Sequence, residues 1–103
     1  MPAKIIALYN APKDAQAFDK YYVERHIPLA KTVPGLKRYE VSAGKVTDPS
    51  GATPYHLVAT LTFDSLPDVQ AALSSAAGVA TAGDLANFAT GGVSLLIFES
   101  KDV

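Results

Sequence analysis

The chain has 103 residues, which is the length of one ordinary domain, so we expect a single domain over residues 1–103. Hydrophobic residues make up 49% of the chain and charged residues 18%, a composition that can form a folded core. Nine Lys and Arg stand against ten Asp and Glu, which excludes the basic excess typical of nucleic-acid-binding proteins. The absence of cysteine excludes disulfides, thiol catalysis and iron–sulfur clusters.

Metal binding and membrane insertion are not expected either. The two histidines, His26 and His56, are not spaced as a pair of metal ligands, so we expect no metal and no cofactor. The apolar runs Ile5–Tyr9 and Val93–Phe98 are too short for a signal peptide or a membrane-spanning helix. We therefore expect a soluble cytoplasmic protein with no membrane partner.

The first part of the chain predicts a strand followed by a helix. Lys4–Tyr9 is apolar at nearly every position, which is typical of a strand covered on both faces. Asp14 is a candidate N-cap for the helix, and Pro28 is expected to end or kink it. Spacings of three and four residues place four side chains on one helix face, namely Ala15, Phe18, Tyr22 and His26.

Two further strands are predicted around the longest loop. Leu36–Ala43 alternates between more polar and less polar residues, as a strand with one polar face does. Lys45–Pro54 is rich in Asp, Pro, Ser, Gly and Thr, so we expect a mobile loop that is a candidate lid. Tyr55–Phe63 alternates again and predicts the third strand.

The last third of the chain predicts helix and then strand. Ser65–Asp68 has the form of a capping box and opens a short amphipathic helix, and Ala76–Ala86 is expected to be helical. Asn87–Gly92 is expected to be a turn, and Val93–Ser100 the final strand. The order β-α-β-β-α-β predicts an α+β, ferredoxin-like fold with an antiparallel sheet.

A single copy of this fold would leave apolar surface exposed. Helices cover only one face of the four-stranded sheet, yet the first and last strands are apolar on both faces. A second copy packed sheet to sheet would cover the other face and form an eight-stranded, dimeric α+β barrel. We therefore expect a homodimer whose interior can hold a small, largely apolar molecule.

His26 and Tyr39 are the candidate catalytic residues. His26 shares the helix face that points toward the sheet, where a histidine can transfer protons near neutral pH; the alternative is a structural histidine bonded to a backbone carbonyl. The Tyr39 hydroxyl can stabilise a developing oxyanion, and the alternative is simple packing. We expect the two side chains to line one common cavity.

The other polar residues have less support from the pattern. His56 opens a strand, where histidines are usually solvated, so it ranks below His26. The aspartates are interpreted as helix-start or turn residues: Asp14, Asp64, Asp68 and Asp84. The five tyrosines suit a ligand pocket and an ordinary interface equally well.

Four segments together resemble the EthD family, which is named for ethyl tert-butyl ether degradation. Phe18–Ala30 resembles its FxxYYxxxHxPLA signature, and Pro34–Val41 resembles its PGLxxYEV strand. Tyr55–Ala59 is similar to its third strand, and Asp84–Gly92 to its NFATGG turn. The resemblance extends over nearly the whole chain.

The resemblance implies a dimeric α+β barrel and a small accessory protein of a degradation pathway, with a possible link to a cytochrome P450 system that cleaves ethers. We also expect Tyr9, Phe18, Tyr22 and Phe88 to bind the ligand. Relatives in the wider superfamily are isomerases or cyclases of lactone-like and polyketide-like compounds. In that alternative, His26 and Tyr39 would supply the acid–base chemistry. A cysteine of one such isomerase has no counterpart here.

Overall fold

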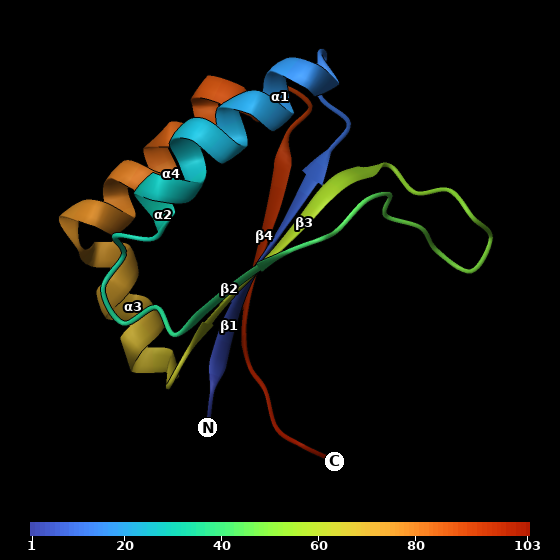
Figure 1. Cartoon of the computed structure of the whole chain (residues 1–103). Coiled ribbons are helices and arrows are strands. Elements are labelled where there is room, and N and C mark those ends of the chain that lie inside the picture. Colours follow the sequence, from blue (N-terminus) through green and yellow to red (C-terminus); the bar gives the residue numbers. More distant parts are fainter.

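The computed structural model describes residues 1–103 and contains one sheet with all of its helices on one side (Figure 1). The elements follow the predicted order, with a short π-helix, η1, between the first two α-helices. In chain order they are β1 (Ala3–Asn10), α1 (Ala15–Tyr21), η1 (Tyr22–His26), α2 (Ile27–Ala30), β2 (Arg38–Val41), β3 (Tyr55–Phe63), α3 (Leu66–Ser74), α4 (Ala76–Phe88) and β4 (Val93–Glu99). The α+β, ferredoxin-like fold is therefore confirmed.

The sheet is antiparallel and has the strand order β2-β3-β1-β4. In the two central pairings Ala7 of β1 aligns with Ala59 of β3 and with Leu95 of β4. Side chains of β1 alternate between buried and half-buried positions, with Tyr9 among the buried ones. Because aligned residues point to the same face, this register defines one face beneath the helices and one face without them.

β2 and α4 differ in length from the prediction, as do β1, which is one residue longer at each end, and β4, which is one residue shorter. β2 runs only from Arg38 to Val41, because it is an edge strand that pairs with β3 alone. α4 continues to Phe88, so Phe88 lies in a helix rather than in the expected turn. Phe88 is only 4% exposed, because its ring packs in the core. This packing keeps Phe88 helical, and the helix ends at Ala89, whose backbone is not helical.

Helices α1, η1 and α2 form one continuous helical segment that starts at the predicted cap. The Asp14 side chain accepts a hydrogen bond from the Ala17 backbone N–H. The helical segment ends at Ala30, two residues after Pro28, and η1 lies just before the proline, where the Ile27 N–H donates to the Tyr22 carbonyl. A proline lacks an N–H and its ring crowds the carbonyl four residues earlier, and the wider π-turn accommodates both effects.

The core beneath the helices consists of two clusters. One cluster contains Ala3, Ile5, Val33, Phe63, Val69 and Ala72. The other contains Ala7, Tyr9, Phe18, Tyr22, Ala59 and Phe88, and we call it the aromatic cluster. On the predicted helix face, Phe18, Tyr22 and His26 are buried, whereas Ala15 is exposed to solvent.

The opposite face of the sheet is not covered by a helix (Figure 1). Several of its side chains are apolar. Leu96 of β4 is 50% exposed and Phe98 is 42% exposed, and Ile6 and Leu8 of β1 are half-buried. Residues 42–54, which we call the β2–β3 arm, project from the body of the molecule (Figure 1). None of the helices is long and apolar enough to cross a membrane.

The junction of α3 and α4 generates a prediction about two helical glycines. A Cβ on Gly78 would lie 1.9 Å from the Ala72 carbonyl oxygen, whereas a Cβ on Gly83 would meet no atom within 4 Å. We expect Gly78→Ala to lower the free energy of unfolding by about 1–3 kcal/mol because backbone must move. The control Gly83→Ala should raise it by about 0.5–1 kcal/mol, because alanine favours helix. Urea unfolding of both variants tests this, and equal effects would contradict the close approach of the two helices.

Candidate functional site

Asp84 joins α4 to the helical segment that contains His26. Its Oδ2 lies 2.9 Å from Nδ1 of His26, and its Oδ1 accepts from the Tyr21 hydroxyl at 2.6 Å. The Asn87 side-chain amide donates to the same Oδ1 at 2.9 Å. His26 also packs on the Phe88 ring, with a centroid distance of 4.6 Å. The histidine is therefore held on two sides by residues of α4.

This environment fixes the protonation of the pair. Burial lowers the pKa of His26 below its ordinary value of 6.5, and Asp84 opposes the shift only in part. Partial burial alone raises the pKa of Asp84, but hydrogen bonds from Tyr21, Asn87 and His26 outweigh it and leave the pKa below 3.8. A carboxylate beside a neutral imidazole requires the proton on Nδ1. Nε2 is then a free acceptor, because it has no hydrogen-bond partner. It is also not fully buried, since every fully buried polar side-chain atom of the protein has a partner.

Tyr39 contacts Tyr22 rather than His26. The two hydroxyl oxygens lie 2.5 Å apart, and either group can donate. Burial and then the neighbouring Tyr39 raise the pKa of Tyr22, and burial raises the pKa of Tyr39. Both phenols are therefore neutral at physiological pH, and the hydroxyl that accepts in this bond keeps its own hydrogen for another partner.

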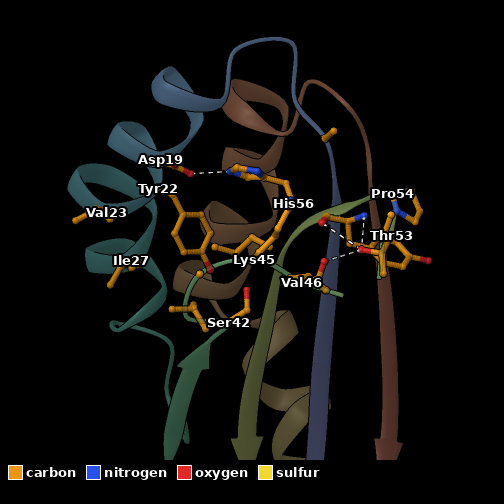
Figure 2. A pocket seen from close by; sticks show the side chains of 16 residues that line it. Asp19, Tyr22, Val23, Ile27, Ser42, Lys45, Val46, Thr53, Pro54 and His56 are labelled. Carbon is orange, nitrogen blue, oxygen red and sulfur yellow. Dashed lines mark hydrogen bonds and ion pairs between the residues drawn. The ribbon is translucent and has the colours of Figure 1, made fainter. Parts of the chain in front are cut away.

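The largest cavity is a groove between the helical segment and the β2–β3 arm (Figure 2). Its volume is about 680 Å³. Tyr22, Val23 and Ile27 form the helical wall. The remaining lining residues come from Ala11, Asp19, the end of β2, the arm and the start of β3. Nine of the 16 lining residues are hydrophobic, so the groove offers an apolar surface with a small number of polar groups.

His56 lies in this groove and is oriented by two neighbours. Its Nε2 lies 2.7 Å from Oδ1 of Asp19 on α1, a contact drawn as a dashed line in Figure 2. Its ring meets the Phe18 ring edge to face at a centroid distance of 5.0 Å. The side chain is 24% exposed, so His56 is more enclosed than the solvated histidine that the sequence pattern indicates.

The predicted site residues are divided among three places. Tyr22 lines the groove, and Tyr9 and His26 line a smaller cavity of about 80 Å³ between the helices and the sheet. Phe18 and Phe88 pack within the aromatic cluster and border a third cavity of about 190 Å³. His26 does not line the groove and Tyr39 does not line the smaller cavity, so these two cavities do not bring the proposed catalytic pair together.

Asp84 and His56 differ from what the sequence pattern indicates. The interpretation of Asp84 as a helix-start or turn residue is wrong, because Asp84 lies in the interior of α4. Aspartate is a poor helix former away from the first turn. An aspartate in the interior of a predicted helix therefore indicates that its side chain has a partner elsewhere in the fold. His56 gave no comparable signal, since its partner Asp19 is 37 positions away in sequence.

No group of three or more His, Cys, Asp or Glu side chains is placed to hold a metal ion. Asp84 and His26 therefore form a two-residue acid–base pair, as do Asp19 and His56. The arrangement thus offers an apolar groove bordered by the His56–Asp19 pair. The His26–Asp84 pair does not line this groove, and His26 packs on Phe88 of the aromatic cluster.

The lowered pKa of His26 predicts a loss of stability in mild acid. Because the unfolded chain takes up the His26 proton first as pH falls below 6.5, the free energy of unfolding should decrease from pH 7.5 to pH 5. His26→Gln keeps a donor for Asp84 but cannot titrate. The free energy of unfolding of this variant should therefore decrease less between pH 7.5 and pH 5 than that of the wild type. Urea unfolding at both pH values, at one protein concentration, measures the difference. An unchanged pH dependence in His26→Gln would show that another group is responsible.

Residues 10–92 match the EthD domain. The chain is 37% identical over 101 residues to an uncharacterized 11.0 kDa protein from the thcB–thcC intergenic region of Rhodococcus erythropolis, covering 97% of this chain and 96% of that protein. An ethyl tert-butyl ether degradation (EthD) family protein from Bacillus halodurans is 35% identical and superposes with a TM-score of 0.89, covering 98% of this chain and all of that one.

More distant structures share the fold alone. A dimeric ferredoxin-like protein of unknown function from Thermobifida fusca is 16% identical with a TM-score of 0.70, covering 95% of this chain and 90% of that one. Hydroxynitrile lyase from Passiflora edulis is 14% identical with a TM-score of 0.76, covering 99% of this chain and 95% of that one. The fold thus occurs in dimers and in at least one enzyme.

The match over residues 10–92, together with relatives above 30% identity over almost the full length, makes this chain a member of the EthD family.

Proposed function

We propose that this protein is a homodimer that binds a small, largely apolar molecule in the groove between the helical segment and the β2–β3 arm. The volume of the groove carries the proposal: about 680 Å³ lies within the roughly 300–1,000 Å³ typical of small-molecule sites. The cavity beside His26 is about 80 Å³, which is too small for such a ligand without rearrangement.

The lining of the groove supports an apolar ligand. Val23 is 63% exposed and Val41 is 41% exposed, and both face a space that also contacts Ile27 and Leu57. Covering these side chains with an apolar molecule removes their surface from water, which contributes about 25 cal/mol for each Å². The His56–Asp19 pair would orient the polar part of the ligand.

The sheet supports the homodimer. Leu96 and Phe98 are about half exposed on a face without helices, beside the half-buried Ile6 and Leu8. Apolar side chains gathered on an uncovered sheet face in this way are unusual on a monomer and typical of an interface. The similar fold from Thermobifida fusca is described as dimeric. Packing two such faces together would form the barrel expected from the sequence.

Membership of the EthD family suggests the pathway. Such a binding protein would be an accessory of a degradation pathway, for example cytochrome P450-dependent ether cleavage, that holds a poorly soluble substrate or product. The groove is suited to that task because it is open to solvent along the arm and needs no cofactor to bind an apolar molecule.

An isomerase or cyclase is the second candidate, and one observation favours it. Asp84 holds the proton on Nδ1 of His26 and leaves Nε2 unpaired, as a general base requires. This reaction needs the aromatic cluster to open, because His26 borders only the smaller cavity. Turnover of a lactone-like or polyketide-like compound by the purified protein, lost in His26→Gln, would establish this candidate over simple binding.

The groove can be tested with 2-methoxynaphthalene as an apolar probe. We expect the probe to shift amide NMR signals of the helical segment and the arm, and Val23→Trp to weaken its binding about tenfold or more by filling the groove. Val79→Trp is the matched control, because Val79 is 62% exposed on α4 and does not line the groove. Signals that shift only around β4, or equal affinity in both variants, would place the probe elsewhere and reject the groove.

The homodimer can be tested by sedimentation at micromolar concentration. We expect the mass of two chains, and we expect Leu96→Asp to give the mass of one, because a charge would be buried between the sheets. Val79→Asp is the control on the helical surface and should stay dimeric. A wild-type monomer over this concentration range would contradict the proposal, as would a Leu96→Asp dimer.

A further inference from the structure

Most polar side chains of the groove are already bonded within the chain. The Ser42 hydroxyl oxygen accepts from the Val58 N–H at 3.0 Å, and the Thr53 hydroxyl oxygen accepts from the Tyr55 N–H at 3.3 Å. The Tyr22 hydroxyl is paired with Tyr39. These groups stabilise the walls of the groove, so they contribute less to recognition of a ligand.

His56 has one free ring nitrogen and, unlike Tyr55 and Lys45, which also have free polar groups, its side chain is held in place by a hydrogen bond. A carboxylate only accepts hydrogen bonds, so the 2.7 Å contact with Asp19 requires a proton on Nε2 of His56. In the neutral ring Nδ1 then carries a lone pair. Nδ1 has no hydrogen-bond partner in the structure. It is partly exposed, since every fully buried polar side-chain atom of the protein has a partner.

The ring cannot easily turn away from this position. Phe18 packs edge to face against it, and Asp19 holds the opposite nitrogen. The His56 side chain is 24% exposed, whereas the Asp19 side chain is 60% exposed, so the imidazole is the more shielded member of the pair. A preoriented and partly desolvated acceptor recognises a donor more strongly than one that is fully hydrated.

We propose that Nδ1 of His56 accepts a hydrogen bond from the ligand, which is therefore a small apolar molecule bearing a hydroxyl donor: a phenol, an enol or an alcohol. This inference rests on the groove being the ligand site and adds the chemical class of the ligand. Asp19 acts as a positioning residue, because it keeps the proton on Nε2 and leaves Nδ1 as the acceptor.

A matched pair of probes tests the inference. 2-Naphthol and 2-methoxynaphthalene share the apolar body and the oxygen, but only the naphthol donates a hydrogen bond. Their affinities are measured by NMR titration at a pH at which the same spectra show the His56 ring and the naphthol to be neutral. We expect the naphthol to bind about fivefold more tightly, as one net hydrogen bond allows.

Two variants assign that preference. His56→Phe keeps an aromatic ring against Phe18 and removes the acceptor, so the two probes should bind equally and 2-methoxynaphthalene should bind as it does to wild type. Tyr55→Phe removes another groove hydroxyl that has no partner in the structure, and the preference should remain. The amide spectrum of each variant verifies its fold, and His56→Leu replaces His56→Phe if that protein is unfolded.

The possible failures are distinguishable. If neither probe binds to wild type, the groove itself is rejected, and the inference with it. If both probes bind equally to wild type, the groove stands and the hydroxyl-bearing class is rejected. A preference that survives in His56→Phe, or that disappears in Tyr55→Phe, would show that His56 is not the acceptor.

Discussion

The Asp84 carboxylate is the group on which the arrangement of the site depends. It is only 10% exposed, and a carboxylate so enclosed is stable only when its oxygens are hydrogen-bonded. The three donors come from two elements: Tyr21 and His26 from the helical segment, and Asn87 from α4. Asp84 therefore fixes the position of one helix against the other at the level of the aromatic cluster.

This contact also determines where Tyr22 lies. Tyr21 and His26 bracket η1 at its two ends, and both are attached to Asp84. The wider π-turn before Pro28 keeps Tyr22 and His26 buried together while Val23 stays on the surface. Tyr22 then bonds Tyr39 across to β2 and lines the groove. The groove wall is thus a consequence of one proline and one buried carboxylate.

Much of the fold could be predicted from local pattern because its determinants are local. The strand over Tyr55–Phe63, the Asp14 cap and the Ser65 cap each depend on neighbouring residues, and the structure confirms all three. The site depends on contacts between distant positions, such as Asp84 with His26 and Asp19 with His56. The groove is harder still to predict from sequence. Its shape depends on how α1, η1 and the arm are placed in space, and no single segment encodes that placement.

The central claim is that the ligand occupies the groove rather than the smaller cavity or the interior between two sheets. A crystal structure of the homodimer with 2-naphthol tests it directly. The account predicts the naphthalene rings against Tyr22, Val23 and Ile27, with the hydroxyl within hydrogen-bond distance of Nδ1 of His56. Naphthol found beside Nε2 of His26, or between the sheets against Leu96 and Phe98, with the groove empty, would contradict it.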